Sequence, residues 1–211
     1  MRVYIFNSVK SAGPRTEELD KIVSLMQSSQ EIRLRTILHR KFIESGDDSS
    51  AEQIKISKIP AFAPCVFFDG RIGRKYVLGL TDICYLDFDD IKEESKLIDA
   101  MNTLRNDKNV LLASRSISNE GLHILIRYKL KDMEIPSEGS LMTPMEIQEV
   151  YGKVCNFFMA KYQNEIGMTA DSHSINMDRL YIMSYDPDLY YNPDAEPLEV
   201  DLNNTLEELI M

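Results

Sequence analysis

The succession of strand and helix patterns after residue 82 constrains the fold of this chain more than any other feature of its sequence. Apolar side chains alternate, or recur at helical spacing, in six consecutive segments. In order, these predict a strand, a helix, two strands, a helix and a strand, at residues 83–88, 91–105, 109–114, 122–128, 143–162 and 179–184. This β-α-β-β-α-β order is the split βαβ arrangement of ferredoxin-like and RRM-like domains. We therefore expect an α+β fold.

A capping signal marks the start of the second of these helices. Thr143 is followed by Pro144 at the first helical position and by Glu146 at the third. A threonine and a glutamate at this spacing can each accept a hydrogen bond from the other's backbone N–H group. The signal predicts that a helix begins here.

The residues before the RRM-like (βαββαβ) unit predict a smaller α/β unit packed on it. The patterns indicate a strand at 2–6, helices at 16–28 and 36–44, a loop at 45–50, and strands at 64–68 and 75–79. We expect a single compact domain with three parts: an N-terminal α/β subdomain (1–80), an RRM-like catalytic subdomain (81–190) and an acidic C-terminal tail (191–211).

The composition predicts a cytoplasmic protein with a sizeable core and no membrane contact. Of the 211 residues, 44% are hydrophobic, yet no stretch approaches the roughly 18 apolar residues of a membrane span. The N-terminus also lacks the apolar region of a signal peptide. Cys65, Cys84 and Cys155 lie far apart and form no CxxC pair, so we expect buried, reduced thiols.

The net charge of −10 is concentrated at the C-terminal end of the chain. Residues 186–211 hold eight acidic residues and no lysine or arginine, which leaves 26 acidic against 24 basic residues elsewhere. Such a nearly neutral body excludes strong non-specific binding of duplex over a broad surface. It leaves room for a local basic groove.

Two acids on the first strand of the RRM-like unit predict a metal site. Asp87 and Asp89 share a strand face with Tyr85, opposite the apolar face that the helices must cover. Carboxylates at this spacing repel each other unless a cation lies between them, and oxygen ligands favour Mg²⁺ or Mn²⁺. A turn at the strand end is the simpler alternative role for the two acids.

The topology predicts that further polar residues converge on this acid pair. In the split βαβ order, the first strand lies between the third and fourth strands and runs antiparallel to both. His123 and Arg127 on the third strand, and Arg179 on the fourth, are then expected to hold a triphosphate beside the metal. Asp171 and Asp178 precede the fourth strand, and either can supply a third carboxylate.

The loop before His123 predicts a phosphate-binding turn. Its residues 116–121 are Ser-Ile-Ser-Asn-Glu-Gly, and small residues such as Ser116 and Ser118 allow backbone amides to approach a phosphate. Without this context, His123 would be interpreted as an ordinary packed histidine.

Three of these motifs resemble those of a known family. The acid-x-acid at 87–89, the small-residue loop that closes on His123, and the acid followed by a strand with arginine at 171–180 are similar to the motifs of VirE-type N-terminal primase-like domains. These domains belong to the archaeo-eukaryotic primase (prim-pol) superfamily. Together with Ile59-Pro60-Ala61-Phe62 and the stretch 184–195, the resemblance covers residues 59–197.

The resemblance implies a primase-polymerase type of fold with the active site in a cleft between the two units. It implies that Asp87, Asp89 and Asp171 hold Mg²⁺ or Mn²⁺, and that Ser118 and His123, with Arg179 nearby, contact the phosphates of the incoming nucleotide. Asp87, Asp89, Asp171 and His123 are then the catalytic residues, and Ser116, Ser118, His123, Arg127 and Arg179 the substrate-binding ones.

The expected function is that of a metal-dependent nucleotidyltransferase. It would act as a primase or primase-polymerase on a single-stranded DNA template with nucleoside triphosphates, in the replication of a mobile element. Such domains often continue into a helicase-type ATPase; this sequence has no Walker A motif, so that partner is expected in a longer chain or a separate one. Two alternatives stay open: a non-catalytic module that binds nucleotide or single-stranded DNA for a helicase or initiator, and a metal-dependent phosphodiesterase.

Overall fold

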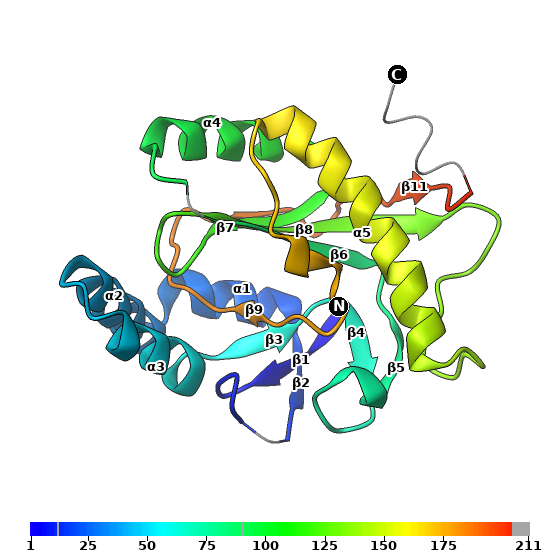
Figure 1. The fold of residues 1–211 in the computed structure, drawn as a ribbon, viewed down its shortest axis with the longest axis horizontal. Coiled ribbons are helices and arrows are strands. Elements are labelled where there is room, and N and C mark those ends of the chain that lie inside the picture. The colour runs from blue at the N-terminus through cyan, green and yellow to red at the C-terminus, as the bar shows by residue number, and fades with distance from the viewer. Residues whose placement is uncertain (12, 90, 204–211) are drawn as a thin grey trace.

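Asp87, His123 and Arg127 lie on a central sheet. In the computed structural model, which describes residues 1–11, 13–89 and 91–203, this sheet is built on β6 (Ile83–Phe88), β7 (Val110–Arg115) and β8 (Leu122–Leu130). β8 pairs antiparallel with β6 on one side and with β7 on the other. The sheet is extended by β10 (Tyr190–Tyr191), beside β7, and by β11 (Leu198–Val200), parallel to the end of β8. The fold is therefore α+β with mainly antiparallel sheets (Figure 1).

Two helices cover one face of the central sheet. α4 (Glu94–Arg105) packs on β7 and α5 (Pro144–Ile166) on β6; in Figure 1, α4 lies above the sheet and α5 crosses in front of it. The predicted capping box of α5 is confirmed: the Thr143 hydroxyl accepts from the N–H of Glu146 (3.4 Å), and the Glu146 carboxylate accepts from the N–H of Thr143 (2.7 Å).

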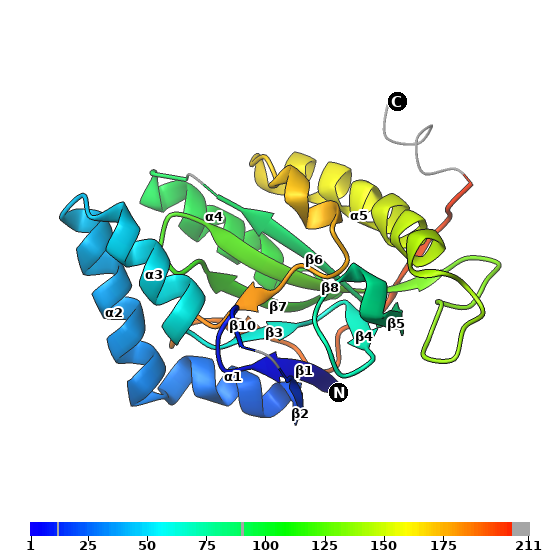
Figure 2. The same ribbon diagram turned by 60° about the horizontal axis from the view of Figure 1, so that its bottom comes forward.

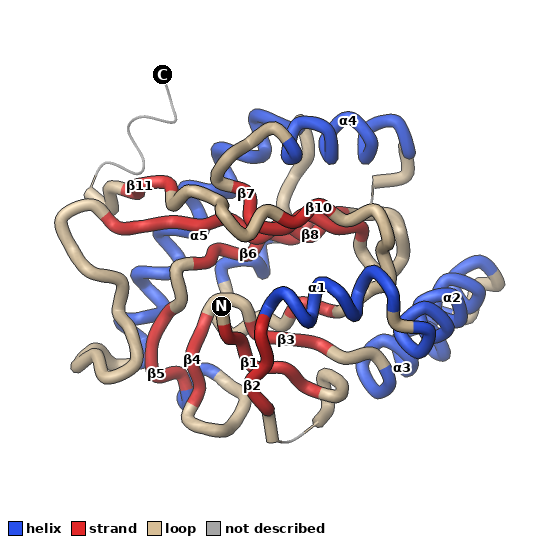
Figure 3. Tube along the Cα trace, turned by 180° about the vertical axis from the view of Figure 1, so that it is seen from behind, coloured by secondary structure: helices blue, strands red, loops and turns tan. Residues whose placement is uncertain are grey.

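A second antiparallel sheet lies below the first. Its order is β2 (Arg15–Glu18), β1 (Arg2–Phe6), β3 (Ala61–Ala63) and β9 (Tyr181–Ile182). A hairpin of β4 (Val66–Phe68) and β5 (Val77–Leu80), with the 3₁₀ turn η1 (Arg74–Tyr76) between them, leads from this sheet into β6. Seen from behind, α1 (Leu19–Ser28) lies between the levels of the two sheets (Figure 3).

The remaining helices, α2 (Gln30–Glu44) and α3 (Asp48–Lys58), pack on each other at one end of the molecule (Figure 2). α3 was not predicted, because its Ser-rich, weakly amphipathic sequence resembles a loop. Its sequence nevertheless begins after a favourable N-cap residue, Asp47, whose carboxylate accepts a hydrogen bond from the N–H of Ser50 (3.1 Å). The helix predicted at 16–28 is also corrected, since residues 15–18 are strand β2.

The fourth strand of the predicted RRM-like unit is elsewhere. β9 does not border β6; it pairs with β3, Ala61 opposite Ile182, and so belongs to the N-terminal sheet. The predicted order, with β6 between the third and fourth strands, is therefore wrong. Tyr181 and Ile182 are apolar and extended, and such a short pattern specifies a strand without specifying its neighbour.

Aromatic contacts join the two sheets. The centre of the Tyr181 ring lies 4.7 Å from the centre of the Phe62 ring and 5.3 Å from that of Tyr85 on β6. The face of β6 that carries Tyr85 and Asp87 is consequently buried against the N-terminal sheet rather than open.

Other expectations concern the thiols, the tail and the membrane. Cys65, Cys84 and Cys155 are free and buried, as predicted. The first part of the acidic tail is ordered as β10 and β11, and residues 204–211 lie outside the described residues. Within the described ranges, no helix is long and apolar enough to cross a membrane.

Candidate functional site

Three carboxylates meet at the end of β6. Asp87 is buried on β6, Asp89 is exposed just beyond the strand, and Asp171 is the N-cap of the 3₁₀ turn η2 (Ser172–Ile175). One carboxylate oxygen of each lies within 4.8 Å of the others. The structure thus brings Asp171 beside the acid pair, and this arrangement offers three oxygen ligands to one cation.

Backbone contacts fix Asp171 against β6. Its N–H donates to the carbonyl oxygen of Asp87 (2.7 Å), and the N–H of Asp87 donates to the hydroxyl of Ser174 (3.2 Å). The Asp171 carboxylate also accepts from the N–H of His173 (2.9 Å). These bonds hold the backbone of Asp171 beside that of Asp87.

Arg179 neutralises two of the three acids. Its Nη2 lies 2.5 Å from Oδ2 of Asp87 and 2.7 Å from Oδ2 of Asp171. It precedes β9, so the pairing of β9 with β3 places the guanidinium over the end of β6. Arg179 reaches the site from the N-terminal sheet and not from a strand beside β6.

His123 lies on the other side of Asp87. Its Nε2 is 3.2 Å from Oδ1 of Asp87, and its ring packs edge-on against Tyr85 and Tyr181. The contact is close but is not aligned as a hydrogen bond, so Oδ1 of Asp87 is buried without a hydrogen-bond partner among the described residues. The other ring nitrogen of His123, Nδ1, is also buried without such a partner there. A buried carboxylate oxygen in this state is costly unless a ligand satisfies it.

The acids differ in their electrostatic environment. Burial would raise the pKa of Asp87, but His123 and Arg179 outweigh this effect and hold that pKa well below its ordinary value. Although part of the Asp89 side chain is exposed, desolvation of its carboxylate by the surrounding protein, followed by the charge of Asp87, raises the pKa of Asp89. A negative potential therefore remains at Asp89 after Arg179 has neutralised its neighbours, and a cation would relieve it.

The loop between β7 and β8 approaches the acids closely because of Gly121. A Cβ on this residue would stand 2.2 Å from the carbonyl oxygen of Phe88 and 3.2 Å from the Asp89 carboxylate. Ser116 and Ser118, whose hydroxyls are 3.1 Å apart, lie in the same loop. The loop turns at Asn119, a non-glycine residue with φ 70°.

A cleft of about 550 Å³ lies between the central sheet and the N-terminal helices, and several of the residues described above line it. Asp87, Asp89, Ser116, Ser118, His123 and Arg179 line one side of the cleft. The other side carries residues of α2 and α3 that the sequence had not suggested: His39, Asp48, Glu52 and Lys55. No sequence signal marked them, because neither helix carries a recognisable motif and α3 itself was missed.

Arg127 is not part of the cleft, contrary to the sequence-based expectation. It stands opposite Ile83, at the far end of β6 from Asp87. Its guanidinium pairs with Asp82 and donates to the carbonyl oxygen of Ala195 (3.2 Å). Alternation along β8 predicted the correct face, but position along the strand places Arg127 too far away.

The donor set fits a hard divalent cation. Three carboxylates converge, one buried oxygen of Asp87 has no hydrogen-bond partner within the described structure, and no sulfur ligand is among them. Mg²⁺ and Mn²⁺ prefer such oxygen ligands. Arg179 occupies Oδ2 of both Asp87 and Asp171, so a cation bound by these atoms must share them with the guanidinium or displace it.

The fold and site define an α+β protein in which three carboxylates meet beside a cleft between the central sheet and a helical pair. A comparison with known families matches residues 54–191 to the family described as BT4734-like, N-terminal domain. Since this match covers more than half of the 211 residues, the chain belongs to that family. Searches of curated proteins and of solved structures found no match.

Proposed function

We propose that this protein is a metal-dependent nucleotidyltransferase of the primase or primase-polymerase type. The observation that carries the proposal is the meeting of Asp87, Asp89 and Asp171 at the edge of a cleft that the first two line together with His123, Ser116 and Ser118. The resemblance of the three sequence motifs to prim-pol domains points to the same fold type and the same chemistry.

In this proposal, Asp87, Asp89 and Asp171 hold Mg²⁺ or Mn²⁺. The bound cation supplies positive charge to the oxygens of the attacked α-phosphorus. Ser116, Ser118 and His123 bind the triphosphate, and Lys55 faces it from the helical side. The cleft positions the 3′-hydroxyl of a nucleic-acid strand beside the triphosphate. Holding the two reactants in this orientation contributes part of the rate enhancement.

A second function has one observation in its favour. Arg179 already neutralises Asp87 and Asp171, as expected of a structural ion pair in a module that binds nucleotide or single-stranded DNA without catalysis. Such a module would serve a helicase-type ATPase or an initiator.

Metal-dependent triphosphate binding and strand extension separate the two functions. Mn²⁺ binding, followed by electron paramagnetic resonance, and thermal stabilisation by Mn²⁺ with a nucleoside triphosphate are expected for the wild type. Both are expected to be lost in Asp89→Asn. Asp99→Asn, at an exposed position on α4, is the matched control and is expected to behave as wild type.

Incorporation of labelled nucleotide on a primed single-stranded template then selects the enzyme. Metal and triphosphate binding without incorporation would favour the non-catalytic module. Absence of both binding signals from the wild type would refute the nucleotidyltransferase.

A further inference from the structure

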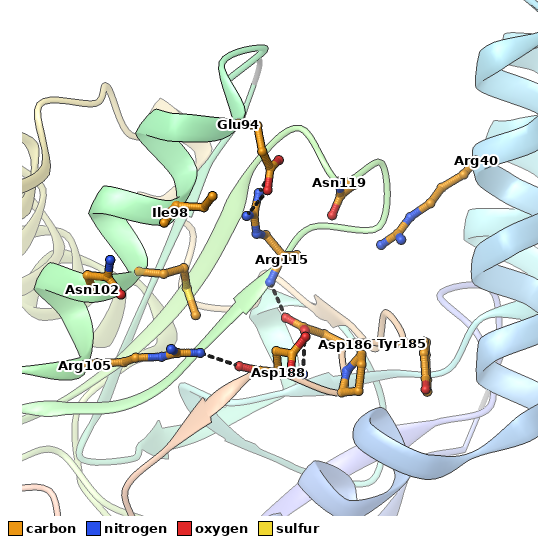
Figure 4. A pocket seen from close by; sticks show the side chains of 12 residues that line it. Arg40, Glu94, Ile98, Asn102, Arg105, Arg115, Asn119, Tyr185, Asp186 and Asp188 are labelled. Atoms are coloured by element: carbon orange, nitrogen blue, oxygen red, sulfur yellow. Dashed lines mark hydrogen bonds and ion pairs between the residues drawn. The ribbon is translucent and has the colours of Figure 1, made fainter.

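A second cavity, of about 350 Å³, adjoins the acidic cleft. Figure 4 shows the side chains that line this cavity. The cavity and the cleft share the loop between β7 and β8, because Ser118 lines the cleft and Asn119 lines the cavity. They also share α2, where His39 faces the cleft and its neighbour Arg40 faces the cavity. A ligand that passes over this loop can therefore occupy both.

Three arginines from three different elements point toward this cavity: Arg40 from α2, Arg105 from α4 and Arg115 from β7 (Figure 4). Arg115 is neutralised by a bidentate pair with Glu94 (2.7 and 3.2 Å). Arg40 and Arg105 have no such acidic partner in the part of the chain that the structure describes. Arg40 donates to the backbone carbonyl oxygen of Ile117 (2.9 Å), and Arg105 donates to that of Asp188 (2.8 Å). Within the described residues, no carboxylate lies within ion-pair distance of either.

Arg40 is only partly accessible to water. Burial lowers the pKa of Arg40, Asp186 opposes that effect, and Arg115 adds to it. A partly desolvated guanidinium without an ion-pair partner is held at a cost in free energy. A bound anion would offset this cost, and the planar guanidinium suits phosphate.

Of the three acids that line the cavity, Glu94, Asp186 and Asp188, the first two are held by partners within the protein. Glu94 is taken by Arg115, and both oxygens of Asp186 accept backbone N–H groups, from Arg115 (2.8 Å) and Asp188 (3.1 Å). Both terminal nitrogens of Arg40, which bonds Ile117 through Nε, and Nη1 of Arg105, which bonds Asp188 through Nη2, are left for a ligand.

Apolar and aromatic side chains complete the lining: Ile98, Met101, Tyr185 and Pro187. Cationic groups that follow a backbone, together with apolar and aromatic surface for bases, form the usual binding site for single-stranded nucleic acid.

We propose that this cavity binds a phosphodiester unit of single-stranded nucleic acid, with Arg40 and Arg105 contacting its phosphate. The cavity then holds the strand next to the cleft in which the strand is extended; this placement of the strand rests on the proposed function. The polymer is the expected ligand, rather than a free phosphate, because apolar surface lies beside the guanidinium groups.

Fluorescence anisotropy of a labelled oligothymidylate, with the full chain in the presence of EDTA, tests this site independently of the acidic cleft. Arg105→Ala is the main variant, since Arg105 is exposed and bonds only a carbonyl. We expect binding to weaken about fivefold. The negative slope of log K against log salt is expected to become shallower by about 0.7, because one phosphate contact is lost. Arg40→Gln is expected to weaken binding similarly, with its folding verified by circular dichroism.

Arg2→Ala is the control, because Arg2 is an exposed arginine on β1 that pairs with Glu18; it is expected to bind as wild type does. Unchanged affinity in both Arg105→Ala and Arg40→Gln would overturn the proposal. So would a wild type that binds no oligonucleotide, or displacement of the oligonucleotide by an equal concentration of inorganic phosphate. Failure of the proposed function is a separate result, the absence of stabilisation by Mn²⁺ and triphosphate.

Discussion

One nitrogen of Arg179, Nη2, contacts both Asp87 and Asp171, at 2.5 and 2.7 Å. The arginine therefore holds one carboxylate oxygen of each of two acids that would hold a divalent cation. Asp87 is buried, and an isolated charge at this position would be costly. The guanidinium keeps the acidic cluster folded when no cation is bound.

Removing Arg179 is expected to increase the affinity of the free protein for Mn²⁺. Arg179→Gln frees Oδ2 of both acids, so we expect Mn²⁺ to bind at least about tenfold more tightly, a change of about 1.4 kcal/mol. In EDTA, the same variant is expected to lose about 2–4 kcal/mol of unfolding free energy, because Asp87 stays buried without its partner. Electron paramagnetic resonance and urea unfolding measure the two effects.

Arg179→Lys provides the control, since it keeps the charge and can contact at least one acid. Its Mn²⁺ affinity is expected to lie between those of the wild type and Arg179→Gln. Weaker Mn²⁺ binding by Arg179→Gln than by the wild type would mean that the guanidinium does not compete with the cation.

Gly121 is expected to tolerate no side chain. In Gly121→Ala the new methyl group would overlap the carbonyl oxygen of Phe88, so the loop or the end of β6 must move. We expect a loss of about 2–4 kcal/mol in unfolding free energy and weaker Mn²⁺ binding. Gly152→Ala, in α5 with free space around it, is expected to stabilise the protein by about 0.5–1 kcal/mol. Equal stability of the two variants would contradict the close approach.

His39 makes the stability depend on pH. Burial, and then the nearby Lys55 and Arg40, lower the pKa of His39 to about 4. The unfolded chain takes up this proton near pH 6.5, so the contribution of His39 is full above that pH and is lost as the pH falls toward 4. We expect the difference in unfolding free energy between wild type and His39→Gln to change by about 2 kcal/mol from pH 7 to pH 5. Parallel stability curves for the two proteins would show that His39 is not buried in its neutral form.

Arg127 is expected to matter for stability and not for the site. Arg127→Ala removes the ion pair with Asp82 and the bond to Ala195, and we expect a loss of about 1–2 kcal/mol. Mn²⁺ and triphosphate affinities, measured by calorimetry, are expected to be unchanged. A large loss of triphosphate affinity in Arg127→Ala would contradict this prediction and show that Arg127 takes part in binding the triphosphate.

The sequence predicted β6 and the acid pair well because the information is local. Ile83–Phe88 is an apolar run that ends at acidic residues, and period-two alternation shows which side chains share a face. Alternation does not give the position along the strand, which is why Arg127 was expected beside Asp87. The contribution of α3 to the cleft, including Lys55, could not be predicted for another reason. α3 reaches the cleft through tertiary packing, and its sequence has no distinctive pattern.

The pairing of β3 with β9 has a consequence for folding kinetics. Ala61 meets Ile182 only after β6, β7 and β8 of the central sheet have been synthesised, so the N-terminal sheet keeps an unpaired edge until late in translation. Closing so long a loop is slow, and the exposed edge is open to association with other chains meanwhile. Because Arg179 lies just before β9, the late step that completes the sheet also delivers the guanidinium to Asp87, and the acidic cluster forms last.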